Sequence, residues 1–110
     1  MTMSKWVDVG SKDQLQDGAK LCTSAAGQEL VVLNVDGELY AIANVCPHAG
    51  MPIGEGDCRG HVITCPFHGY AYDIRSGRHV EFPHEELPVQ TFRVRVEGER
   101  VQVQLPDPSE

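Results

Sequence analysis

Two short clusters of cysteine and histidine constrain this chain more than any other feature of its sequence. The first is Cys46-Pro-His48, and the second, after 16 intervening residues, is Cys65-Pro-Phe-His68. Prolines and glycines lie in and beside both clusters, so both stretches are expected to form tight turns. Thiolate and imidazole are strong protein ligands for iron, zinc and copper near neutral pH. The spacing therefore predicts two facing turns that hold one metal centre with four ligands.

Two kinds of metal centre suit this ligand set, and the order of the ligands favours one of them. Zinc accepts two Cys and two His, but zinc fingers usually pair Cys with Cys and His with His. A Rieske [2Fe-2S] cluster has two Cys on one iron and two His on the other. Each cluster here carries one Cys and one His, so each loop would give one ligand to each iron. A structural Cys2His2 zinc module remains the alternative.

The sequences C-P-H-A-G, from Cys46, and C-P-F-H-G, from Cys65, resemble the Rieske iron–sulfur signature. Strand and turn patterns on both sides extend the resemblance to essentially all 110 residues. The resemblance implies one [2Fe-2S] cluster whose ligands are Cys46, His48, Cys65 and His68. It also implies a β base with an inserted cluster-binding subdomain, expected at about residues 44–73 of a single domain covering residues 1–110.

The family has two branches, and the residues beside the motifs separate them. In Rieske proteins of cytochrome bc complexes, two further cysteines join the loops by a disulfide. Those cysteines would fall at Met51 and Phe67 of this chain. The chain therefore resembles the other branch, the soluble Rieske-type ferredoxins of bacterial oxygenase systems. The two remaining cysteines, Cys22 and Cys58, are expected to be free thiols.

The resemblance also implies roles for residues around the cluster. Met51 and Phe67 would form an apolar cover in place of the disulfide. Pro83 falls in a loop that resembles the proline loop over the cluster, and Tyr72 stands where a tyrosine can donate its hydroxyl to a ligand sulfur, that of Cys46 being expected. Three histidines lie outside the motif and are expected at the surface: His61, His79 and His84.

Short alternating and β-branched stretches predict an all-β chain of small antiparallel sheets, a sandwich or incomplete barrel. Asp36-Gly37 predicts a hairpin between strands at 29–35 and 38–43, and Val101, Val103 and Leu105 are expected to face the core. Further strands are expected at 6–9, 19–23, 61–64, 70–74, 90–97 and 100–105. A helical turn is expected at 11–15.

Composition limits the possible partners. The net charge of −7 argues against nucleic acid and anionic membranes. No apolar run or leader-like segment is apparent, so a cytoplasmic protein is expected. The chain is also expected to be a monomer.

The function expected from the resemblance is one-electron transfer rather than catalysis. The chain would carry electrons from an NAD(P)H-dependent flavin reductase to a terminal oxygenase, such as a ring-hydroxylating dioxygenase. A second possibility is the small subunit of an assimilatory nitrite reductase, whose forms often lack cluster ligands that this chain has. An oxygenase in its own right is disfavoured, because 110 residues leave no room for the domain that holds mononuclear iron.

Overall fold

The computed structural model describes residues 4–47, 50–66, 69–84 and 87–106. Most of this part of the chain is in short β-strands, and the only helices described there are two single 3-10 turns. The elements in chain order are β1 (Ser4–Ser11), η1 (Lys12–Gln14), β2 (Lys20–Ala25), β3 (Gln28–Val35), β4 (Glu38–Ala43), η2 (Ile53–Glu55), β5 (Cys58–Arg59), β6 (Val62–Thr64), β7 (Ala71–Asp73), β8 (Thr91–Phe92), β9 (Val94–Glu97) and β10 (Arg100–Pro106). The predicted all-β class with small antiparallel sheets is confirmed.

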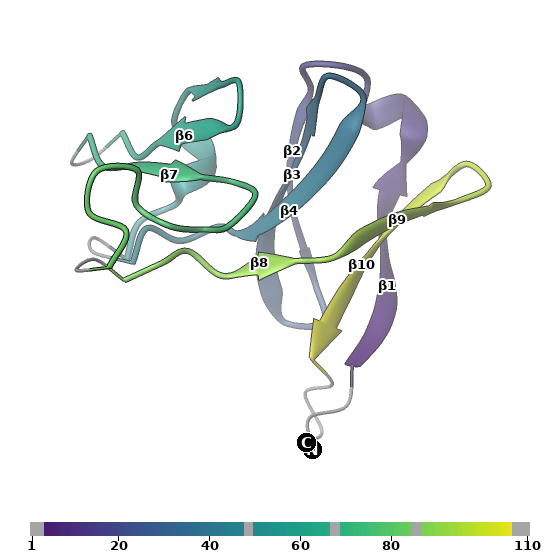
Figure 1. The fold of residues 1–110 in the computed structure, drawn as a ribbon. Coiled ribbons are helices and arrows are strands. Elements are labelled where there is room, and N and C mark those ends of the chain that lie inside the picture. Colours follow the sequence, from purple (N-terminus) through teal and green to yellow (C-terminus); the bar gives the residue numbers. More distant parts are fainter. Residues whose placement is uncertain (1–3, 48–49, 67–68, 85–86, 107–110) are drawn as a thin grey trace.

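The strands form three antiparallel sheets that lie one after another across the molecule (Figure 1). The strand orders are β1-β10-β9, β2-β3-β4-β8 and β5-β6-β7. In Figure 1 the β6–β7 sheet lies on one side of the central sheet, and β1, β9 and β10 lie on the other. The central sheet therefore connects the base of the molecule to the part that carries the Cys-His motifs.

The central sheet is buried on both faces, which explains the apolar run in β3. Leu30 and Val32 pack into a core with the β1-β10-β9 sheet. Val31 and Leu33 point the other way, into a core that contains Cys46 and Cys65. Successive side chains of a strand point to opposite faces, so one continuous run of apolar residues supplies both cores.

The part of the chain with the motifs is inserted between two strands that are neighbours in the central sheet. The chain leaves the sheet after β4 and returns to it at β8, where Ala41 pairs with Phe92 and Ile42 with Thr91. The Ala43 N–H donates to the carbonyl of Gln90 at 2.9 Å. Both ends of the insertion are thus anchored on one hydrogen-bonded strand pair.

Several sequence predictions hold in detail. Asp36 and Gly37 have φ values of 53° and 87°, as a two-residue primed hairpin turn requires. Val101, Val103 and Leu105 are buried, as predicted. η1 forms where a helical turn was expected, and the Gln14 side chain accepts the Ser11 N–H at 2.8 Å.

Other predictions need correction. The strand expected at 19–23 runs instead from Lys20 to Ala25, and the strand expected at 90–97 is divided at Arg93. β5 and η2 were not predicted.

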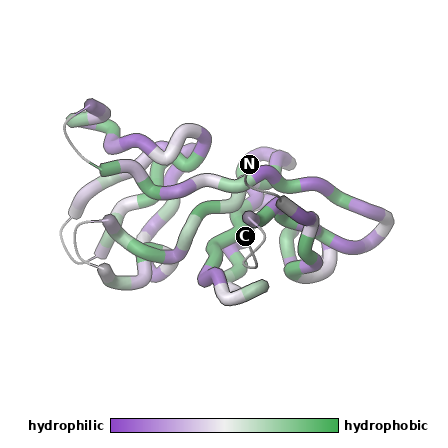
Figure 2. The backbone as a smooth tube through the Cα atoms, turned by 90° about the horizontal axis from the view of Figure 1, so that it is seen from below, coloured by the Kyte–Doolittle hydropathy of each residue, from purple (hydrophilic) through white to green (hydrophobic). Residues whose placement is uncertain are grey.

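Figure 2 shows that hydropathy alternates along the chain in short stretches, in keeping with half-buried strands. In the described part of the chain, no helix has the length and apolar character needed to span a bilayer.

Candidate metal centre

The two loops that follow Cys46 and Cys65 are closed by the same pair of backbone hydrogen bonds. The Cys46 N–H donates to the carbonyl of Met51 at 2.8 Å, and the Cys46 carbonyl accepts the Gly50 N–H at 2.8 Å. In the second loop, the Cys65 N–H donates to Tyr70 at 2.7 Å and its carbonyl accepts the Gly69 N–H at 3.0 Å. Two segments far apart in sequence therefore repeat one six-residue turn.

A glycine with positive φ occupies the same place in each turn. Gly50 has φ 66° and Gly69 has φ 68°, values in the left-handed region that other residues adopt only at a cost. Proline follows the cysteine in both turns, and its ring fixes φ there. The described ends of the two turns thus match, although the His spacing in the sequence differs: His48 is two residues after its cysteine and His68 three.

Both predicted ligand cysteines are fully buried and share one core. Cys46 and Cys65 have no exposed surface, and both pack in the core that also contains Ile63 and Tyr72. The other two predicted ligands, His48 and His68, lie outside the described residues. Within the described ranges, His, Cys, Asp and Glu form no group of three that could hold a metal ion. The full ligand set therefore stays a prediction.

A strap of residues after the first loop supports the strand that leads to Cys65. The strap, residues 53–57, contains η2 and buried Ile53. The Thr64 N–H, one residue before Cys65, donates to the Asp57 carbonyl at 2.9 Å. Lys20 of β2 donates its Nζ proton to the Gly56 carbonyl at 2.7 Å. The first loop, the second loop and the central sheet are thereby joined at one place.

Tyr72 lies where the sequence predicts, beside the first cysteine. It is 1% exposed, pairs with Ile63 across β6 and β7, and its hydroxyl oxygen lies 4.0 Å from the Cys46 Sγ. A hydroxyl that donates to a ligand sulfur stabilises the reduced, more negative cluster and raises its potential.

The Tyr72→Phe protein is expected to have a lower reduction potential than the wild type. Loss of one hydrogen bond of about 1 kcal/mol corresponds to about 20 to 60 mV for a one-electron couple. Protein-film voltammetry of both proteins at one pH measures the difference. An unchanged potential would mean that Tyr72 only packs beside the cysteine.

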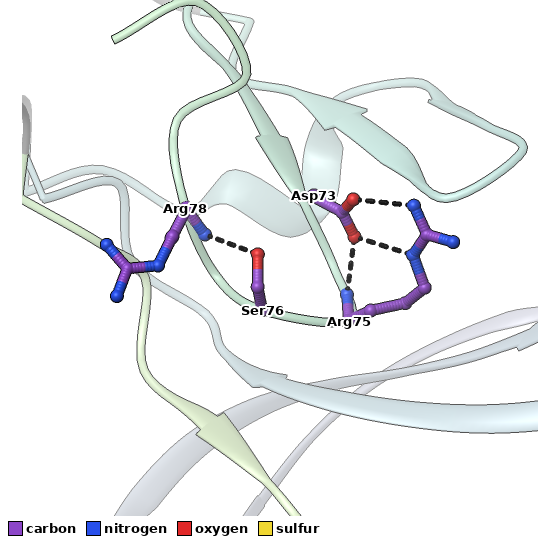
Figure 3. A network of polar contacts seen from close by, with 4 residues as sticks. All are labelled: Asp73, Arg75, Ser76 and Arg78. Carbon is purple, nitrogen blue, oxygen red and sulfur yellow. Dashed lines mark hydrogen bonds and ion pairs between the residues drawn. The ribbon is translucent and has the colours of Figure 1, made fainter. Parts of the chain in front are cut away.

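The turn after β7 is fixed by polar contacts (Figure 3). Asp73 accepts the backbone N–H of Arg75 at 2.8 Å and pairs with its guanidinium at 3.0 and 2.8 Å. The Arg78 N–H donates to the Ser76 hydroxyl at 3.2 Å. The Asp73 N–H donates to the carbonyl of Arg78 at 2.9 Å. This turn returns the chain alongside β7 and so places the segment that follows Arg78 against Tyr72.

The Asp73–Arg75 pair is expected to contribute less stability in acid. Hydrogen bonding from Arg75 is the main cause that lowers the pKa of Asp73 below 3.8. The contribution is therefore complete above pH 3.8 and is lost as the pH falls through the lowered pKa. Asp73→Asn should cost less than about 1 kcal/mol at neutral pH, because the pair is partly exposed. The gap in melting temperature from the wild type should narrow as the pH falls below 3.8 and through the lowered pKa, and a constant gap would contradict this.

The remaining predicted neighbours of the site differ in exposure. Met51 is 41% exposed. Pro83 is half-buried and its carbonyl accepts a guanidinium N–H of Arg78 at 3.1 Å. His84 is exposed, as predicted, and Phe67 lies outside the described residues.

The expectation that His79 lies at the surface is wrong. Its side chain is 3% exposed, and it pairs with Tyr72 in an isolated antiparallel bridge. His79 lies opposite Tyr72 because the turn from Asp73 to Arg78 folds the chain back along β7. His61, in contrast, is half-buried, with its ring edge-on to Tyr40 at 5.5 Å.

The two cysteines outside the motif are free thiols in the structure. Cys22 is exposed on β2. Cys58 is partly buried, and burial is the main cause that raises the pKa of its thiol, with Lys20 acting in the opposite direction. Its S–H donates to the Gly60 carbonyl at 3.5 Å. A thiol held protonated in this way is a weak nucleophile and a weak metal ligand.

The arrangement fits an iron–sulfur cluster better than a redox disulfide or a catalytic thiol. Two fully buried cysteines begin the matched turns, and their backbone polar groups are paired within those turns. Fully buried cysteine sulfurs, one of them beside a tyrosine hydroxyl, suit a metal–sulfur group. Fold and site together define a small β protein with a candidate metal centre at two loops.

Comparison with known proteins identifies the family. The Rieske [2Fe-2S] domain model matches residues 5–100, and the chain belongs to this family, whose cofactor is one [2Fe-2S] cluster. The ferredoxin component of the naphthalene 1,2-dioxygenase system of Pseudomonas aeruginosa is 33% identical over 92% of this chain and 96% of that protein.

Two solved structures have the same fold. The Sphingomonas yanoikuyae B1 ferredoxin is 30% identical, with a TM-score of 0.82 over 93% of this chain and all of that one. A complex of reduced oxygenase and oxidized ferredoxin in carbazole 1,9a-dioxygenase contains a chain that is 31% identical. That chain matches with a TM-score of 0.79 over 89% of this chain and 91% of its own length.

Proposed function

We propose that this chain is a Rieske-type ferredoxin, a one-electron carrier between an NAD(P)H-dependent flavin reductase and a terminal oxygenase such as a ring-hydroxylating dioxygenase. The observation that carries the proposal is the near full-length match to a ferredoxin component of a dioxygenase system. The complex of oxygenase and ferredoxin among the structural relatives supports direct transfer to an oxygenase. We infer a carrier rather than a catalyst, acting as a cytoplasmic monomer.

Cys46 and Cys65 would hold one iron, and His48 and His68 the other. The bound cluster supplies a one-electron couple whose potential is raised by its neutral histidine ligands. The protein's own part is to hold and shield the ligands. The matched turns hold both cysteines through backbone hydrogen bonds, and complete burial keeps water from their sulfur atoms. The geometry of a preorganised site changes little when the cluster is reduced, and this favours fast electron transfer.

Anaerobic titration with dithionite tests the carrier function directly. The purified protein should take up one electron per molecule and return it fully on reoxidation. It should not oxidise NADH when no reductase is present. Uptake of no electrons, or NADH oxidation by the protein alone, would contradict the proposal.

Docking on partners is expected to depend on salt. The net charge of −7 favours basic patches on the reductase and the oxygenase. The rate of reduction by the reductase of a naphthalene dioxygenase system should fall as salt rises to about 0.1 M and above, where charges about 10 Å apart are screened. A rate that does not change over this range would mean that apolar contacts dominate docking, for which half-exposed Phe82 and Met51 are available.

A further inference from the structure

His79 is the one buried polar side chain in the part of the chain that the structure describes. Its Nδ1 lies 3.1 Å from the backbone nitrogens of both Glu81 and Phe82 and accepts their N–H groups. A nitrogen that accepts two N–H groups carries no proton, so the proton of the neutral ring is on Nε2. Among the described residues, Nε2 has no hydrogen-bond partner.

A buried N–H without a partner destabilises a fold, and an apolar side chain of the same size would avoid that loss. The two hydrogen bonds that Nδ1 accepts from Glu81 and Phe82, on the other edge of the ring, compensate for this loss and hold the turn at 80–82. The Val80 N–H donates to Ala71 of β7 at 2.9 Å and fixes the same turn to the strand. The backbone next to His79 is thus hydrogen-bonded to β7, the strand that contains Tyr72.

The ring of His79 also packs directly on the tyrosine beside the first cysteine. It lies edge-on to Tyr72, with centroids 5.4 Å apart and planes at 79°. It makes a similar contact with Tyr70 at 5.1 Å, and Phe82 lies 5.5 Å away on the turn that Nδ1 holds. Edge-to-face contacts of this kind fix the position of an aromatic ring. Tyr72 in turn places its hydroxyl 4.0 Å from the Cys46 sulfur.

We propose that His79 is a positioning residue for the cluster: its ring holds Tyr72 so that the tyrosine hydroxyl faces Cys46, while its Nδ1 holds the 80–82 turn. The proposal rests on the proposed cluster ligation by Cys46. The His79 side chain would thus have two separate roles. The ring acts on the reduction potential through Tyr72, and the nitrogen acts on the turn.

Two substitutions separate these roles. In His79→Asn, the amide oxygen can replace Nδ1 as acceptor, but the ring is lost. The equilibrium constant for reduction should fall about three- to tenfold, which is about 28 to 59 mV at 59 mV per factor of ten. In His79→Phe the ring remains and the acceptor is lost. The potential should then stay at the wild-type value, while the Glu81 and Phe82 amides lose protection from hydrogen exchange.

The decisive measurement is the potential of His79→Asn in the Tyr72→Phe background. If His79 acts through Tyr72, the substitution produces no further fall there. An unchanged potential in the single variant, or an equal fall in both backgrounds, would overturn the proposal. His61→Phe is the matched control, because His61 also packs edge-on against a tyrosine, Tyr40. This control should keep the wild-type potential.

The same measurements distinguish a failure of the proposed function from a failure of the proposal for His79. A wild-type protein without a one-electron couple would refute the ligation, and hydrogen exchange would still test whether Nδ1 holds the turn. If the wild type binds its cluster and neither His79 variant does, His79 serves folding alone and the proposal is overturned.

Discussion

The Cys65→Ser protein is expected to be purified almost colourless, with at least tenfold less iron than the wild type. A serine hydroxyl does not ionise near neutral pH, whereas thiolate is the ligand that iron–sulfur clusters require. Even substitutions outside the ligand shell lower metal affinity about 10- to 100-fold, so loss of a ligand should be more severe. Cys65 is fully buried, so water could not replace it without opening the core. Iron and acid-labile sulfide assays, with the visible spectrum, measure the effect.

Cys58→Ser is the matched control for this experiment. Cys58 lies on β5, which pairs with the strand leading to Cys65, and its S–H is directed to the Gly60 carbonyl. This variant should retain its full content of iron and sulfide. Equal loss in both variants would mean that any cysteine substitution disrupts the subdomain, and the ligand assignment would lose its support.

The histidine ligands call for a separate experiment, because the structure does not describe them. His48→Ala and His68→Ala should each abolish the Rieske-type EPR signal of the reduced protein, whereas His84→Ala should keep it. His84 is an exposed histidine outside the motif. An unchanged signal in a motif variant would show that another residue binds the iron.

Gly56→Ala is expected to destabilise the protein strongly. A Cβ atom at Gly56 would lie 1.8 Å from the carbonyl oxygen of Thr64, the residue just before Cys65. Backbone atoms cannot rotate away, so the strap or the strand must shift, at a cost of about 3 kcal/mol. For a chain of this size the apparent melting temperature should fall by about 10 to 20 °C. Circular dichroism and cluster absorbance at one heating rate should report the same fall.

Gly60→Ala provides the comparison for Gly56. Gly60 has a positive φ of 59°, but a Cβ atom there would meet nothing within 4 Å. The cost should be only the backbone strain of about 1 kcal/mol. If Gly56→Ala melts within a few degrees of Gly60→Ala, the strap is looser than the structure indicates.

Local chemistry explains which elements could be predicted from the sequence. The Asp36-Gly37 turn was predictable because aspartate and glycine both tolerate the positive φ that a primed turn requires. The strand at 100–106 was predictable because Val101, Val103 and Leu105 alternate with polar residues. The loops were predictable because each motif carries its own proline and glycine.

Long-range pairing explains what the sequence did not show. Ala26-Gly27 forms the same kind of primed turn, with φ values of 52° and 80°, but alanine gives no local signal for it. The two-residue strand β5 is too short for a period and exists because of its partner, Ile63 of β6. His79 is buried only because the turn after Asp73 folds back on β7. Tertiary contacts decided each of these features.

Mössbauer spectroscopy of the oxidised protein, produced in cells grown on ⁵⁷Fe, tests directly whether the two irons have different ligands. Ligation of one iron by Cys46 and Cys65 and of the other by His48 and His68 makes the two irons chemically different. Two quadrupole doublets of equal area are expected, together with matching amounts of iron and labile sulfide. A single doublet from two equivalent irons, or a colourless protein with stoichiometric zinc, would contradict it.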